Sequence, residues 1–186
     1  MNYFYFHGYG SSPEAFKAED MRKILGAENV YAPDFNLPVT ELIELFNQIE
    51  LKIDKLQKSG EEVCIVGSSL GGLFALYISS RTNCNAILLN PALFPLLIIP
   101  TITLSFNEKE IIEAHRLSLY AYEHFNPEKI QVWLTHDELI NHEILTKPFF
   151  VKGTRDYKLI PMAVANTHDF VGFYDVFKEY IENNGK

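Results

Sequence analysis

Short apolar runs alternate with longer segments of helical periodicity along most of the chain. The runs are rich in aromatic and β-branched residues and stop near turn-forming residues, which is typical of β-strands. One of them, EVCIVG at residues 62–67, is apolar throughout its interior, as expected for a strand covered on both faces of a parallel sheet. The predicted strands occupy residues 2–8, 29–33, 62–67, 85–91 and 129–135.

Segments with apolar residues three or four positions apart separate these strands and predict helices. The most regular one covers residues 40–61, with Thr40 at its start and Gly60 at its end. Its apolar face consists of Leu42, Leu45, Phe46, Ile49, Ile53 and Leu56. The other predicted helices occupy residues 12–27 (opening at Ser12-Pro13), 70–81, 108–124 and 172–184.

Strands that alternate with helices predict an α/β protein with a mostly parallel, doubly wound sheet and helices on both of its faces. A chain of 186 residues is long enough for one such domain, because it can bury roughly 70% of the surface that its unfolded form exposes. We therefore expect a single domain over residues 1–186. In sheets of this kind the reactive loops collect at the carboxyl ends of the strands.

Two segments are less regular. Residues 148–162 (PFFVKGTRDYKLIPM) indicate two strands around a glycine-containing turn, with Asp156 in the turn. The most apolar stretch, residues 92–104, contains two prolines and is too short to span a membrane. It fits two interpretations equally well: a small cap within residues 93–129 that lines an acyl pocket, or simple packing on the sheet.

Charge and cysteine content limit the kinds of partner and compartment that we expect. The formal net charge of −8 argues against a nucleic-acid partner, because phosphate binding needs clustered lysine and arginine. Cys64 and Cys84 lie in or beside strand-like runs, where we expect small packing residues of a reducing compartment. The amino terminus begins directly as a strand, without a basic segment or cleavage site, so we expect a cytoplasmic protein.

The motif GSSLG at residues 67–71 matches G-x-S-x-G between a predicted strand and a predicted helix. In a nucleophile elbow the central serine has strained backbone angles, and small residues two positions away avoid a clash. Ser69 is therefore the predicted nucleophile, supported by Gly67 and Gly71, and the Leu70 N–H is a predicted oxyanion donor. The loop lacks the Lys-Ser/Thr of a phosphate-binding P-loop and the G-x-G-x-x-G of a dinucleotide site.

A serine nucleophile needs a base and an orienting carboxylate, which in α/β-hydrolases follow it in the order acid, then histidine. His168 lies after the last strand-like run and before the last helix, so it is the predicted base. Asp137 follows the strand at 129–135 and is the favoured acid. Asp156 is the alternative, although too few residues separate it from His168 for a parallel crossover, and Glu138 is the third candidate.

The second oxyanion donor is expected in the loop after the first strand. There His7 and Gly8 end the strand, and the Tyr9 N–H would face the Leu70 N–H. By itself, His7 would be a strand-end residue that satisfies backbone groups. The segment HDELINHE at residues 136–143 contains two histidines, but their spacing differs from H-E-x-x-H. We expect no metal ion and no cofactor.

These motifs resemble the α/β-hydrolases, and more narrowly the small bacterial YqiA/YcfP-like esterases. YFHGYGSSPEAFKA is similar to the family's H-G-F-x-S-S-P opening, and GSSLGG to its elbow. NPAL, THDELI and THDFVGF are similar to its N-P-A segment, acid loop and terminal histidine loop. The resemblance implies an esterase or thioesterase for small acyl groups, with Ser69, Asp137 and His168 as the triad.

The chain departs from that family in two places. His136 stands where the family usually has glycine, and the stretch from Asp137 to His168 is longer than usual, so Asp156 remains an alternative acid. Residues 93–129 match poorly beyond NPAL and give little information on the substrate. A non-catalytic protein that uses the same fold for binding is the alternative function.

Overall fold

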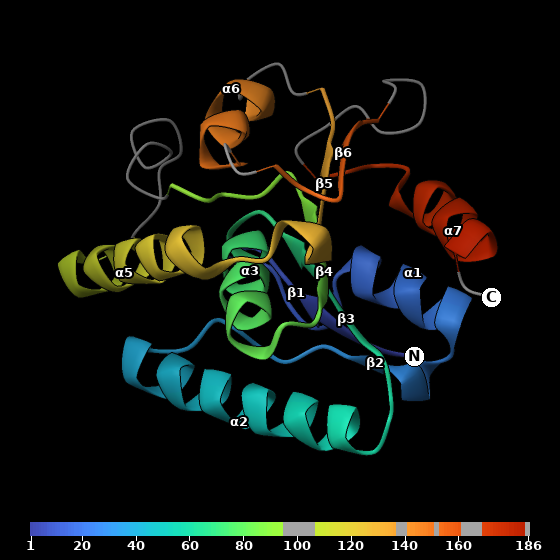
Figure 1. The fold of residues 1–186 in the computed structure, drawn as a ribbon, viewed down its shortest axis with the longest axis horizontal. Coiled ribbons are helices and arrows are strands. Elements are labelled where there is room, and N and C mark those ends of the chain that lie inside the picture. Colours follow the sequence, from blue (N-terminus) through green and yellow to red (C-terminus); the bar gives the residue numbers. More distant parts are fainter. Residues whose placement is uncertain (95–106, 137–140, 151–152, 161–168, 185–186) are drawn as a thin grey trace.

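The computed structural model describes residues 1–94, 107–136, 141–150, 153–160 and 169–184. These residues contain one six-stranded sheet in the order β2-β1-β3-β4-β5-β6, and every neighbouring pair of strands is parallel (Figure 1). The strands are β1 (Asn2–Phe6), β2 (Val30–Tyr31), β3 (Val63–Ser68), β4 (Asn85–Leu89), β5 (Ile130–Leu134) and β6 (Asp156–Leu159).

Helices cover both faces of the sheet. In Figure 1, α1 and α7 lie on one side, and α2, α3 and α5 lie on the other. The helices are α1 (Phe16–Leu25), α2 (Val39–Lys58), α3 (Leu70–Thr82), α5 (Glu108–His124), α6 (His142–Thr146) and α7 (Phe173–Asn184). Short 3-10 helices are η1 (Ala27–Asn29), η2 (Pro127–Lys129) and η3 (Lys147–Phe150). None of the helices described here is long and apolar enough to cross a membrane.

Two hydrophobic cores result from the alternation of side chains along each strand. Tyr5 and Val66 pack toward α1 and α7, whereas Phe6 and Ile65 pack toward α2, α3 and α5. All six residues of β3 are buried, which explains why its sequence is an apolar run rather than an alternating one. Both cysteines are buried and free.

The predicted α/β class and parallel sheet are confirmed. All five predicted strands are present, and α5 has the predicted bounds. On the predicted apolar face of α2, Phe46, Ile49 and Ile53 are buried, and the three leucines pack partly buried against the same core. The predicted cap segment includes α5, which lies beside α3; residues 95–106 of that segment lie outside the described residues.

Two predictions about elements are wrong. α1 begins at Phe16 rather than at Ser12-Pro13, because the Ser12 hydroxyl and carbonyl accept hydrogen bonds from the Glu14 and Ala15 N–H groups and form a turn. The described residues of the 148–162 segment do not form the predicted hairpin with Asp156 in its turn. Lys147–Phe150 is a 3-10 helix whose phenylalanines enter the core, and Asp156 is the first residue of β6, which pairs in parallel with β5.

The register of the sheet sets the height of each strand end. Ser68 at the end of β3 lies opposite Leu89 of β4, which lies opposite Trp133 of β5 and then Lys158 of β6. The carboxyl ends of these four strands are therefore level. The segments that follow these strands therefore emerge at one edge of the sheet. The predicted nucleophile directly follows Ser68 at this edge.

Candidate active site

Ser69 is the single residue between β3 and α3. Its backbone has φ 54° and ψ −120°, which is outside the regions that side-chain-bearing residues ordinarily occupy. Such a conformation costs of order 1–3 kcal/mol and persists only where the surroundings impose it. Here the Ser69 N–H donates to the Leu89 carbonyl (3.0 Å), and the Ser69 carbonyl accepts from the Gly72 and Ala92 N–H groups (2.9 Å each).

The two glycines of the motif are required by close packing. A Cβ on Gly67 would lie 2.3 Å from the Gly71 carbonyl oxygen, and a Cβ on Gly71 would lie 2.1 Å from the Phe6 carbonyl oxygen. Both contacts are with backbone, which cannot rotate away. Any larger residue at either position would push α3 away from β1 and β3 and displace the Ser69 turn.

The loop after β1 contacts this turn directly. A Cβ built on Gly8 would lie 3.2 Å from Ser69 Cβ and 3.8 Å from Ser69 Oγ. Glycine therefore lets the main chain of this loop approach the serine side chain. Leu70, the next residue after the serine, is the first residue of α3, where backbone N–H groups have no partner within the helix. The two segments predicted to supply oxyanion donors are thus both adjacent to Ser69.

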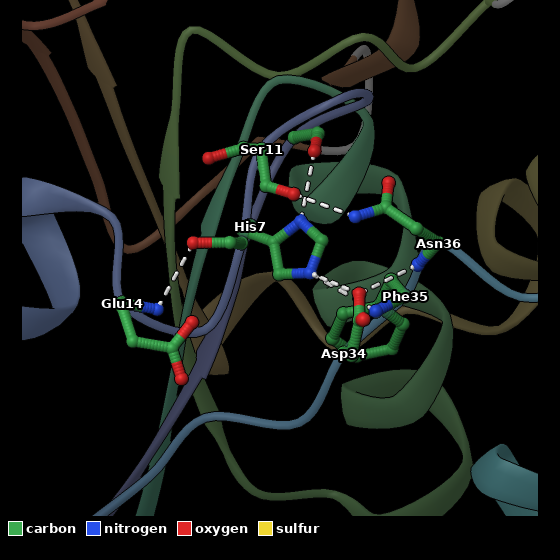
Figure 2. A network of polar contacts seen from close by, with 8 residues as sticks. His7, Ser11, Glu14, Asp34, Phe35 and Asn36 are labelled. Carbon is green, nitrogen blue, oxygen red and sulfur yellow. Dashed lines mark hydrogen bonds and ion pairs between the residues drawn. The ribbon is translucent and has the colours of Figure 1, made fainter.

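His7 is buried and ties the Gly8 loop to the segment after β2 (Figure 2). The Phe35 N–H donates to His7 Nε2 at 3.0 Å, which assigns the proton to Nδ1. Nδ1–H then donates to the Gly8 carbonyl at 2.9 Å, and that carbonyl also accepts from the Ser11 N–H at 3.2 Å. Asp34 Oδ1 lies 3.2 Å from Nε2 and accepts from the Asn36 N–H.

These hydrogen bonds fix the orientation of the peptide between Gly8 and Tyr9. The peptide bond is planar and, among the described residues, no peptide is cis. The N–H of Tyr9 therefore points opposite to the Gly8 carbonyl that His7 holds. Sequence reasoning found His7 through its motif, but its partners Phe35 and Asp34 come from a distant segment that no local pattern identifies.

The carboxyl ends of β4 and β5 are joined by a reciprocal side-chain clamp that the sequence did not reveal. Asn90 Nδ2 donates to Thr135 Oγ1 at 2.7 Å, and the Thr135 N–H donates to Asn90 Oδ1 at 2.8 Å. Both residues are buried, and His136 after them is exposed. The predicted acid Asp137 and its neighbour Glu138 lie outside the described residues.

Asp156 does not meet Ser69. It lies opposite Gln131 of β5, which lies opposite Ile87 of β4 and then Val66 of β3. Asp156 is thus three strands away from β3, roughly 14 Å, and at a height about 10 Å before the serine along the strand direction. It belongs to the amino-terminal part of the sheet, so the alternative acid of the sequence analysis does not converge with the nucleophile.

The predicted base His168 also lies outside the described residues, but the residue after it is well held. Lys17 Nζ, near the start of α1, donates to the Asp169 carbonyl at 2.5 Å. The next residue, Phe170, is fully buried against α7. Burial lowers the pKa of Lys17 to about 8, although Asp169 and Asp20 act in the opposite direction. No sequence signal marked Lys17.

A cleft of about 620 Å³ opens beside the Ser69 turn. It borders both predicted oxyanion segments, because Tyr9 and Leu70 line it. Its walls come from the loop after β1, the segment after β2, and the facing sides of α2, α3 and α5. The lining residues are His7, Gly8, Tyr9, Gly10, Phe35, Asn36, Leu37, Pro38, Leu42, Leu70, Phe74, Asn107, Glu110, Glu113, Ala114 and Leu117.

No three metal-ligating side chains gather anywhere in the described part of the chain. Of the two histidines considered as ligands, His136 is exposed and His142 is buried in α6.

Comparisons with known proteins agree on the architecture. Est1E from Butyrivibrio proteoclasticus, solved with ferulic acid, has a TM-score of 0.64 at 16% identity, over 97% of this chain and 86% of that one. The monoacylglycerol lipase of Paleococcus ferrophilus gives 0.63 at 14% identity, over 97% and 93%. The dienelactone hydrolase of Anabaena variabilis gives 0.60 at 15% identity, over 97% and 85%. At these identities the likeness establishes the fold, that of the α/β-hydrolases. A model of the uncharacterised protein family UPF0227 matches residues 2–183.

Proposed function

The chain belongs to the uncharacterised protein family UPF0227, and we propose that it is a serine hydrolase that cleaves carboxylic esters or thioesters through an acyl-enzyme on Ser69. The observation that carries this proposal is the Ser69 turn. Ser69 has φ 54° although it carries a side chain, and it lies between a buried strand and a helix. The backbone of a second loop lies against it. Strain of this kind is typical of functional positions.

In the proposed reaction His168 accepts the Ser69 hydroxyl proton while Ser69 Oγ attacks the acyl carbonyl. The carbonyl oxygen becomes an oxyanion, which accepts hydrogen bonds from the Tyr9 and Leu70 N–H groups. One such donor is worth roughly 2.7–4 kcal/mol of transition-state stabilisation. The leaving group departs with the proton from His168, and water then attacks the acyl-enzyme in the same way, which releases a carboxylic acid and restores Ser69.

Asp137 is the acid that we propose to orient His168. It follows β5 by three positions, and the carboxyl end of β5 is level with that of β3. The Asn90–Thr135 clamp holds the chain just before it. Glu138, the next residue in the sequence, is the alternative acid. Asp156 is not proposed, because its place in β6 is at the amino-terminal part of the sheet.

The likeness to esterases and lipases supports ester chemistry, and the cleft beside Ser69 supports a small-molecule substrate. A volume of about 620 Å³ is within the range of roughly 300–1,000 Å³ that is usual for sites of drug-sized ligands. Most of its lining is apolar, as an acyl chain requires. No step of the proposed reaction uses a metal ion or a cofactor.

Hydrolysis of p-nitrophenyl butyrate tests the role of Ser69. We expect Ser69→Ala to lower kcat by at least about 10³-fold, because it removes the nucleophile. Ser68→Ala is the matched control, since it removes a hydroxyl from the adjacent, buried residue at the end of β3, and it should retain most of the activity. Equal activity of the wild type and Ser69→Ala would exclude the proposed nucleophile.

A further inference from the structure

The cleft beside Ser69 combines an apolar floor with an acidic wall. The floor includes Phe35, Phe74 and Leu117, which are almost completely buried, and the rings of Phe35 and Phe74 lie 5.4 Å apart. The wall includes Glu110 and Glu113 of α5. These two residues are three positions apart in one helix, so their carboxylates lie on the same face.

The acidic wall is only weakly neutralised. Arg116 Nη1 lies 3.6 Å from Glu113 Oε2, but the Arg116 side chain is 74% exposed and is not part of the lining. Glu110 Oε2 accepts a hydrogen bond from the Asn107 N–H, which leaves its charge in place. No lysine or arginine occurs among the described residues that line the cleft. By sequence, residues 95–106 just before this wall contain no charged residue.

The acyl part of the substrate is the part that enters this cleft, if the reaction is the one proposed above. The leaving group must face the base, and the residue after His168 is held by Lys17 at the start of α1. α1 and α7 cover one face of the sheet, whereas α2, α3 and α5, which form the cleft, cover the other. An ester whose carbonyl oxygen points to Tyr9 and Leu70 therefore directs its leaving group toward α1 and its acyl group toward α5.

From this arrangement we propose that the enzyme selects its substrate by charge: the cleft accepts acyl groups that are apolar next to the carbonyl and carry a positive charge at their far end. Glu110 and Glu113 are the specificity-determining residues. A carboxylate at the same end of the acyl group is disfavoured, because like charges repel strongly where water is partly excluded. This inference rests on the proposed function and deepens it.

Three p-nitrophenyl esters of six-carbon acids test the proposal: the hexanoate, the 6-(trimethylammonio)hexanoate and the half ester of adipate. Their leaving group is identical, so kcat/KM reports on the acyl end. We expect the cationic ester to exceed the anionic one by at least about 10-fold at low salt, with the neutral ester between them. The ratio should shrink at 0.5 M salt.

Variants that each remove one negative charge show which residues cause the preference for the cationic ester. Glu110→Gln and Glu113→Gln should each lower the cationic-to-anionic ratio several-fold. Glutamine at position 110 still accepts the Asn107 N–H, so the capping box of α5 is kept. Glu123→Gln is the matched control, because it removes the same charge from the exposed far end of α5, outside the cleft, and should leave the ratio unchanged.

The outcomes separate this inference from the proposed function. Hydrolysis of all three esters at equal kcat/KM, or a ratio that the double variant Glu110→Gln/Glu113→Gln leaves unchanged, would overturn charge selection while ester hydrolysis stands. Should no ester be hydrolysed, the proposed function fails. The cleft is then tested by calorimetry with the corresponding p-nitroanilides on Ser69→Ala, where tighter binding of the cationic compound supports the inference and equal binding overturns it.

Discussion

At the scale of single residues, Ser69 and the groups around it show how a short motif acquires a definite geometry. The glycines at 67 and 71 accept backbone contacts that no other residue would tolerate, and Gly8 lets a second loop reach the serine. The motif therefore predicts the turn, because steric contacts between residues a few positions apart determine which residue types fit. Contacts between distant segments do not follow from such patterns.

His7 is the residue-scale example of such a distant contact, and it leads to a prediction. His7→Phe keeps a ring in the buried site but removes the hydrogen bonds to the Gly8 carbonyl and the Phe35 N–H. We expect kcat for p-nitrophenyl butyrate to fall on the order of 10²-fold, with a much smaller change in KM, because the Tyr9 N–H loses its orientation.

His7→Asn separates positioning from general damage. Its amide nitrogen occupies nearly the place of Nδ1 and can still donate to the Gly8 carbonyl, so part of the lost kcat should return. The free energies of unfolding of both variants, measured by urea denaturation, provide the control. Equal kcat in the two variants, or losses that merely follow stability, would contradict the positioning role.

At the scale of elements, the sequence predicted what local periodicity determines. The five apolar runs became strands, and the long amphipathic pattern at 40–61 became α2. The wrong predictions concern segments whose structure depends on tertiary contacts. β6 is a short edge strand without buried positions, so its four residues carry no apolar pattern. Phe149 and Phe150 instead resemble a strand in sequence but pack their rings into the core from a 3-10 helix.

A second prediction concerns Lys17, near the start of α1. Burial lowers its pKa from 10.5 to about 8 in the folded protein. Between these two values the unfolded chain keeps a proton that the folded chain has lost, so the free energy of unfolding rises with pH through this window. From pH 7 to pH 9.5 this group contributes an increase of about 2 kcal/mol.

Lys17→Met removes that contribution, so its free energy of unfolding should lack this increase. Urea denaturation at both pH values gives the free energies of unfolding of the wild type and the variant. The contributions of the other titrating groups cancel in the difference between the two proteins. A difference that does not change with pH would show that Lys17 does not titrate with a lowered pKa. Because Lys17 also holds the Asp169 carbonyl beside the proposed base, we expect the variant to lose hydrolytic activity as well.

At the scale of the whole molecule, the strand order places the loop after β1 and the Ser69 turn after β3 side by side at one edge of the sheet. Four of the six strands, β3 to β6, lie in the sheet in the order in which they occur along the chain, and β1 lies between β2 and β3. The order of motifs along the chain was enough to predict this proximity of the Gly8 loop and Ser69, because parallel strands must all end at the same edge. The predicted acid and base lie outside the described residues. The cleft with its acidic wall was not predictable, since it needs the placement of α5 against α2 and α3.

The most direct test of the account is covalent labelling of the folded wild-type protein with a fluorophosphonate, followed by intact-mass measurement and peptide mapping. These reagents react with a serine only when a base activates it and nearby donors stabilise the charge that develops on the phosphoryl oxygen. We predict one adduct per chain, located on Ser69, and no adduct on heat-denatured protein. A folded protein that takes up no label, or takes it up on another serine, would contradict the account.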